Sequence, residues 1–86
     1  MMERTARVGS KSGLHARPAA VFVQSAKEFP GKVTLAKNEK TVNAKSLLSV
    51  MSLGASQGDE VVLIVNGDNA EAVIDNLVAL LESDLG

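Results

Sequence analysis

The sequence contains no cysteine, tryptophan or tyrosine, and its only phenylalanines are Phe22 and Phe29. Without cysteine the chain can form neither a disulfide nor a thiolate metal site. Two phenylalanines do not provide a set of rings on which nucleic-acid bases could stack, so we expect no direct binding of nucleic acid.

Long hydrophobic runs are also missing. The longest, residues 61–65 and 77–81, fall far short of the roughly 20 residues that span a bilayer. The N-terminal residues MMERTARV include no apolar segment of the kind found in secretion signals. We therefore expect a soluble, cytoplasmic protein without membrane insertion, and 86 residues predict a single domain over residues 1–86.

Basic residues are absent from the second half of the chain. Residues 1–45 contain all nine lysines and arginines and three of the ten acids, whereas residues 46–86 contain the other seven acids. Such a distribution can produce a basic surface that attracts acidic partners. The alternative is that folding brings the two halves together and cancels much of the asymmetry.

Apolar residues recur at helical spacing in two stretches. They are Ala19, Phe22, Val23, Ala26 and Phe29 in residues 15–29, and Ala70, Val73, Leu77 and Leu80 in the second stretch. Pro30 and Gly31 predict the end of the first helix, and Asp68 with Glu71 resembles a capping box at the start of the second.

A third, shorter helix is predicted over residues 47–53, between Ser46 as N-cap and Gly54. Strands are predicted over residues 5–8, 32–37, 41–43 and 60–65, the last in a central position because its apolar run is continuous. The order βαββαβα predicts an α+β fold in which helices cover one face of a four-stranded antiparallel sheet.

The only histidine, His15, stands where the first helix begins, and Arg17 and Pro18 follow it. Because proline is tolerated only in the first turn, Pro18 places the helix start within a residue or two of His15. The next N–H groups then lack partners inside the helix and lie at the positive end of its dipole, where anions bind. The dipole also disfavours imidazolium, so we expect a neutral, nucleophilic ring at neutral pH.

Arg17 adds donors that suit phosphate oxygens. A neutral imidazole can attack phosphorus, and the amides and the guanidinium can receive the oxygens. These features favour a histidine that is itself phosphorylated, although an ordinary surface histidine remains the alternative. No clustered carboxylates or thiols accompany His15, so neither a metal site nor a hydrolase is expected.

The stretches SGLHARPAA (residues 12–20) and VNAKSLLSVMSLGASQGDEV (residues 42–61) carry a family resemblance. The chain resembles HPr, the histidine-containing phosphocarrier of the bacterial phosphoenolpyruvate:sugar phosphotransferase system, over essentially its whole length. The resemblance implies an open-faced β-sandwich of four antiparallel strands covered by three helices.

The resemblance also implies a reaction. His15 would accept a phosphoryl group on Nδ1 from phosphorylated enzyme I and pass it to a histidine on the enzyme IIA domain of a sugar permease. Arg17 would pair with the phosphate, Ala16 and Arg17 would supply backbone N–H donors, and Pro18 would mark the helix start. The protein would then be a carrier rather than an enzyme, without a cofactor, and we expect a monomer.

Ser46 has two interpretations. A serine before a helix is commonly a plain N-cap. The resemblance adds that, in low-GC Gram-positive bacteria and some others, the matching serine is phosphorylated by an HPr kinase/phosphorylase, and the product acts as corepressor for a catabolite control transcription factor. Residues 50–54 follow the Gram-positive pattern, whereas Leu47, Leu48 and Ser49 depart from its commonest residues.

The resemblance further implies that partners dock around the first two helices, on apolar residues that here match Leu47, Leu48 and Met51. Leu47 and Leu48 are adjacent and point about 100° apart on a helix, so we expect one of them at the surface. Two other functions remain open: a regulatory module that binds a transcription factor or metabolic enzyme without carrying phosphate, and a carrier of the nitrogen-regulatory branch. His15 favours a carrier, because relatives of the regulatory kind can lack this histidine.

Overall fold

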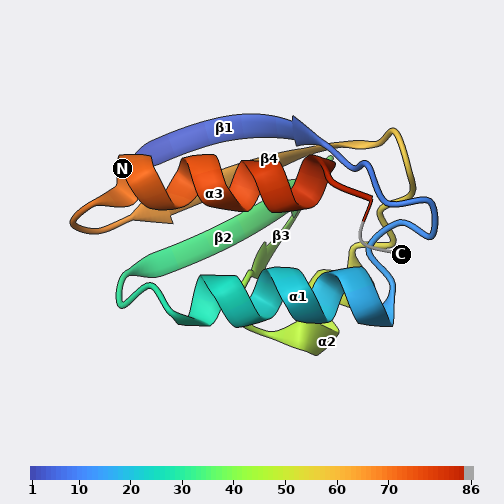
Figure 1. The fold of residues 1–86 in the computed structure, drawn as a ribbon, viewed down its shortest axis with the longest axis horizontal. Coiled ribbons are helices and arrows are strands. Elements are labelled where there is room, and N and C mark those ends of the chain that lie inside the picture. Colours follow the sequence, from blue (N-terminus) through green and yellow to red (C-terminus); the bar gives the residue numbers. More distant parts are fainter. Residues whose placement is uncertain (85–86) are drawn as a thin grey trace.

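The structure, a computed structural model, describes residues 1–84 and has the predicted order of elements (Figure 1). The strands are β1 (Met2–Arg7), β2 (Lys32–Lys37), β3 (Lys40–Asn43) and β4 (Glu60–Asn66). The helices are α1 (Ala16–Lys27), α2 (Leu47–Ser52) and α3 (Ala70–Glu82). All strand pairs are antiparallel, in the order β1-β4-β2-β3. The predicted α+β fold is confirmed.

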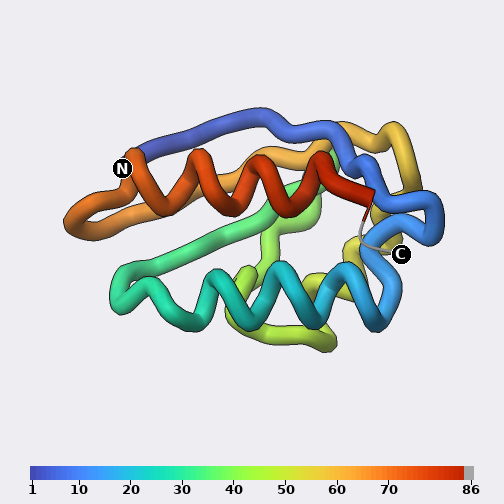
Figure 2. Tube along the Cα trace, in the orientation of Figure 1, coloured from blue at the N-terminus to red at the C-terminus, as the bar shows by residue number. Residues whose placement is uncertain are grey.

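The helices cover one face of the sheet and leave the other face open. α1 and α3 run in opposite directions across that face, and α2 lies beside α1 (Figure 2). In β4 the side chains of Val61, Leu63 and Val65 are fully buried, whereas the alternate residues Val62 and Ile64 are half-buried on the open face. The continuous apolar run of β4 therefore marks a central strand, as predicted.

The two long helices use their apolar residues differently. Every residue of the stripe predicted for α1 is buried. In α3 the buried residues are Ala70, Ile74, Leu77 and Leu81, while Val73 and Leu80 are only partly buried. The predicted stripe was therefore half wrong. α3 is apolar over more than one face, so helical spacing alone could not tell which face packs on the sheet.

The start of α3 also differs from the prediction. Its N-cap is Asn69, in the left-handed conformation (φ 68°), and the Asn69 side chain makes no capping hydrogen bond. The expected capping box of Asp68 and Glu71 is wrong, because Asp68 lies one residue too early. An N-cap side chain reaches the helix amides from extended backbone, which Asn69 does not have.

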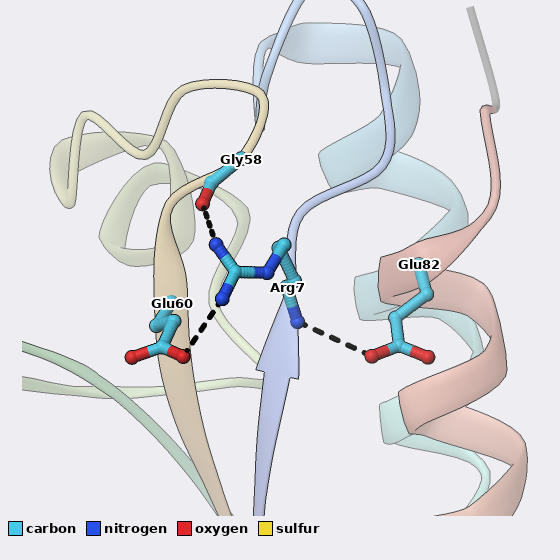
Figure 3. A network of polar contacts seen from close by, with 4 residues as sticks. All are labelled: Arg7, Gly58, Glu60 and Glu82. Carbon is cyan, nitrogen blue, oxygen red and sulfur yellow. Dashed lines mark hydrogen bonds and ion pairs between the residues drawn. The ribbon is translucent and has the colours of Figure 1, made fainter.

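β1 begins three residues earlier than predicted and ends at Arg7. Because β1 is an edge strand, it tolerates the charged residues that concealed its start. The Arg7 guanidinium donates to Gly58 O (2.9 Å) and pairs with Glu60 (3.0 Å), and its backbone N–H donates to Glu82 Oε2 (3.3 Å) (Figure 3). Arg7 thus joins β1, β4 and α3. Within residues 1–84 no helix has both the length and the apolar character that crossing a bilayer requires.

Candidate functional site

His15 is the N-cap of α1, in agreement with the helix start predicted from Pro18. Its backbone is extended (φ −80°, ψ −171°), and its carbonyl accepts the first helical hydrogen bond, from Ala19 N (2.9 Å). Its side chain makes no capping hydrogen bond and is exposed. The imidazole is therefore open to a partner, while the His15 backbone is fixed by the helix.

Two backbone N–H groups at this helix end have no acceptor among residues 1–84. They belong to Ala16 and Arg17; Pro18 has no N–H, and Ala19 is the first residue to donate inside the helix. Both residues are exposed, and the Arg17 guanidinium forms no ion pair within the described chain. The free donors and the helix dipole make a site for an anion directly after the imidazole.

The loop before His15 is held against a distant segment of the chain. Leu14 is buried, and its N–H donates to Ala55 O (3.0 Å). Gly13 has φ 71°, and a Cβ on it would lie 2.4 Å from the same carbonyl oxygen. Only glycine allows this close approach, so the contact positions the backbone that leads into His15.

Asp59 supports that segment. The Ser56 N–H donates to Asp59 Oδ2 (2.9 Å), and Lys37 Nζ lies 3.0 Å from the same oxygen. The hydrogen bond from Ser56, with the neighbouring Lys37 ammonium, lowers the pKa of Asp59 below its ordinary value of 3.8. Lys37 also donates to Gly54 O (3.3 Å), so it connects β2 with the end of α2. No sequence pattern predicted the contribution of Lys37, because it lies in β2, far from Asp59 in the chain.

Ser46 is the N-cap of α2, as predicted. Its backbone is extended, its Oγ accepts a hydrogen bond from Ser49 N (3.4 Å), and the residue is half-buried. Lys45, the preceding residue, donates from Nζ to the carbonyl of Phe29, just beyond α1. The capping role is confirmed, and phosphorylation of Ser46 stays a prediction.

The apolar residues of α2 divide between core and surface. Val50 is fully buried and Met51 is half-buried against the core, whereas Leu48 is 80% exposed and Leu47 39% exposed. We expected one leucine of the pair at the surface, and the structure exposes both, because Val50 occupies the inward position. Val21 of the adjacent helix α1 is also 39% exposed, which the sequence analysis missed. The sequence did indicate this exposure, because Val21 is apolar but falls outside the helical spacing of the buried residues of α1.

The two halves of the chain are joined by ion pairs. Arg4 pairs with Asp75, Arg7 with Glu60 and Lys37 with Asp59. Each pair joins a basic residue from residues 1–45 to an acid from residues 46–86, so folding cancels part of the charge asymmetry. No cluster of three or more potential metal ligands occurs in the described part of the chain.

Comparison with known proteins places these features in a family. A family model described as the PTS HPr component phosphorylation site matches residues 2–83. The phosphocarrier protein HPr of Streptomyces coelicolor is 44% identical over 86 residues, covering 99% of this chain and 92% of its own. The HPr-like protein Crh of Bacillus subtilis is 42% identical over 85 residues, covering 99% of this chain and all of its own.

Solved structures show the same fold. A crystal structure of HPr from Thermoanaerobacter tengcongensis aligns with a TM-score of 0.91 and 51% identity, over 96% of this chain and 93% of that chain. It supports the arrangement of four antiparallel strands and three helices described above.

Proposed function

The chain belongs to the HPr family, and on this premise we propose that it carries a phosphoryl group on Nδ1 of His15. The group would come from phosphorylated enzyme I and go to enzyme IIA domains of sugar permeases in the cytoplasm. The observation that carries this proposal is the exposed imidazole beside Arg17 and two N–H groups, none of which has a partner for its free donors within residues 1–84.

The proposed transfer uses few groups of this chain. The lone pair of Nδ1 attacks phosphorus, a P–N bond forms, and the bond between phosphorus and the donor breaks with its electron pair returning to the donor. The oxygens of the transferred group then meet the N–H groups of Ala16 and Arg17 and the Arg17 guanidinium, while Pro18 fixes the helix start. Such stabilisation lowers the barrier in both directions, which suits a carrier that must also give the group away.

Docking would use the surface of α1 and α2. Leu47 and Leu48 are exposed and Met51 is half-buried beside them on α2. Exposed apolar side chains on a small monomer commonly mark a contact surface. We infer that these residues contact enzyme I and the IIA domains. Phosphorylation of Ser46 by an HPr kinase/phosphorylase would place negative charge at the edge of the same surface. The phosphorylated form would then bind a catabolite control transcription factor.

A second function is favoured by the similarity to Crh, which is about as close as the similarity to HPr. The chain could act as a regulatory binding module through Ser46 without accepting phosphate on a histidine. His15 and Arg17 distinguish the two functions, because a module that only binds has no use for an exposed nucleophile at an anion site. A carrier of a nitrogen-regulatory branch would use the same chemistry with other partners.

The test is incubation with labelled phosphoenolpyruvate and enzyme I, followed by mapping of the label. A carrier takes one acid-labile, base-stable phosphoryl group, and His15→Ala folds normally and takes none. Acid-labile labelling of His15→Ala would show that another residue is the acceptor. A chain that enzyme I leaves unlabelled, and that an HPr kinase phosphorylates at Ser46, would be the regulatory module.

A further inference from the structure

A groove of about 770 Å³ lies between the last turn of α1 and the length of α3. Phe29, Pro30, Val73, Leu77 and Leu80 form its apolar part. Its α1 residues begin at Ser25, nine residues after the first residue of α1, which corresponds to roughly 14 Å along the helix axis. These residues therefore lie at the other end of α1 from His15.

Some of the apolar residues that line the groove are not buried in the core. Leu77 is buried in the core and also reaches the groove, whereas Val73 and Leu80 are only partly buried. These two residues are the ones that made α3 look apolar on a second face. No other residue of the described chain covers them completely, so part of their apolar surface is in contact with water. An apolar ligand bound in the groove would remove that surface from water, which is favourable.

The charges in the groove have one sign and lie at one end. Glu28 follows α1 directly and Asp68 precedes α3, and neither lysine nor arginine lines the groove. The end of α1 and the start of α3 lie together, since a Cβ on Gly67 would stand 2.8 Å from the Phe29 ring. Figure 1 shows both segments at the same side of the molecule.

Neither carboxylate has a charged or hydrogen-bonding partner within residues 1–84. Glu28 and Asp68 are exposed, and their side chains make no ion pair or hydrogen bond with other residues in the range 1–84. The three ion pairs of the described chain use other acids. A cation at this end of the groove would therefore meet two carboxylates that have no partner in this range.

We propose that this groove binds a small amphiphilic cation, with its ammonium group between Glu28 and Asp68 and its apolar part along Val73, Leu77 and Leu80. The volume falls within the range typical of sites for small ligands. An anion would be repelled by the same carboxylates, and a neutral chain would leave them unpaired. The site is independent of phosphoryl transfer.

Octylammonium, octanoate and butylammonium are suitable probes, because they separate charge from apolar length. Amide chemical shifts of the ¹⁵N-labelled full chain should change saturably with octylammonium, most strongly in residues 25–30 and 68–80. Butylammonium lacks four methylene groups and should bind at least about tenfold more weakly. Octanoate should not saturate.

Matched variants test the carboxylates. Glu28→Gln and Asp68→Asn should each weaken octylammonium binding, up to roughly fivefold, as expected for an exposed ion pair. Glu71→Gln removes an exposed acid from α3 outside the groove and should leave the affinity unchanged, as should His15→Ala. Circular dichroism verifies that each variant is folded.

Several outcomes would overturn the proposal. They are a failure of octylammonium to saturate, octanoate binding as tightly, shift changes centred outside the groove, and an equal loss in Glu71→Gln. If a helical peptide of leucine and lysine saturates the groove whereas octylammonium does not, the occupant is a protein segment and the small-ligand proposal is wrong.

Discussion

Arg17 lies two residues after His15, the proposed phosphoryl acceptor, and has no ion-pair partner of its own in the described chain. Its loss should change the free energy of unfolding by less than about 1 kcal/mol, because exposed charges contribute little to stability. Losing its charge-assisted hydrogen bond to a phosphoryl group costs about 1.5–3 kcal/mol, which slows transfer about tenfold or more. We therefore expect Arg17→Ala to fold normally and to exchange phosphate slowly with enzyme I.

Rapid-quench measurement of phosphoryl transfer tests this expectation, with Arg17→Lys and Lys27→Ala alongside. Arg17→Lys keeps the charge and loses the planar fork, so it should fall between wild type and Arg17→Ala. Lys27→Ala removes an exposed cation from the far end of α1 and should transfer at the wild-type rate when enzyme I is saturating, because association then no longer limits the reaction. Wild-type kinetics in Arg17→Ala would exclude the guanidinium from the site.

Asp59 makes stability depend on pH. The Ser56 hydrogen bond and Lys37 lower its pKa in the folded protein, so its stabilising effect is present at neutral pH and is lost as the pH falls below 3.8, through the lowered pKa. Asp59→Asn should therefore melt at a lower temperature than wild type at neutral pH. The two melting curves should converge as the pH falls below that value.

Thermal melts of both proteins across this pH range check the result. Glu39→Gln, which removes an exposed acid in the turn between β2 and β3 that forms no ion pair within residues 1–84, is the control and should follow wild type throughout. A melting-temperature difference for Asp59→Asn that persists unchanged in acid would assign the effect to lost packing rather than to the charge.

α2 is the element in which the proposed phosphorylation of Ser46 would affect both stability and docking. A negative charge at Ser46 meets the positive end of the helix, which should stabilise the fold by about 0.3–1 kcal/mol and raise the melting temperature by a few degrees. The same charge lies next to the exposed Leu47 and Leu48 and should repel an acidic partner. Ser46→Asp should thus melt higher than wild type and accept phosphate from enzyme I more slowly.

Ser46→Asn separates charge from capping, since asparagine also caps helices well and is neutral. It should match wild type in transfer, and the difference between the two variants gives the effect of charge alone. If Ser46→Asp melts below Ser46→Asn, or accepts phosphate at the wild-type rate at low salt, repulsion at α2 is not the mechanism.

Comparison of α1 with α3 shows which features of an element can be predicted. The start and the buried face of α1 followed from Pro18 and a single apolar stripe, whereas the helix ends at Lys27, two residues before the stripe does. In α3 two overlapping stripes competed, and the left-handed Asn69 ended the loop without a side-chain cap. Local residue patterns give a unique answer only when one face of a helix is apolar.

The same limit applies to the candidate site. His15, Ala16, Arg17 and Pro18 are contiguous, so the helix start alone brings them together. The contact of Gly13 with Ala55 and the support from Asp59 and Lys37 join residues that are more than 20 positions apart, and only the fold shows them.

At the scale of the whole molecule, the two charged halves neutralise each other only in part. Three ion pairs join them, and Arg17 and Lys27 on α1 stay unpaired within the described chain. We expect association with enzyme I to slow as salt rises, because steering by these cations is screened over about 8 Å at physiological ionic strength.

Stopped-flow association rates over a range of salt concentrations measure this dependence. Charge reversal in Lys27→Glu should lower the low-salt rate and flatten the curve. A rate that is the same at low and high salt would show that apolar contacts on α2 control association. Sedimentation of the free chain at the same concentrations checks the expectation of a monomer.

The contact between Glu82 and the Arg7 amide should affect how the protein behaves at high concentration. In β1 the even-numbered residues face β4, as the hydrogen bond of Val8 N to Asp59 O shows, so the odd-numbered ones turn their backbone groups away from the sheet. Glu82 occupies one of these outward donors. Glu82 therefore hinders the pairing of another strand with the free edge of β1. Glu82→Ala should make concentrated solutions of this protein associate edge to edge on storage, and thioflavin fluorescence should rise in the variant but not in wild type.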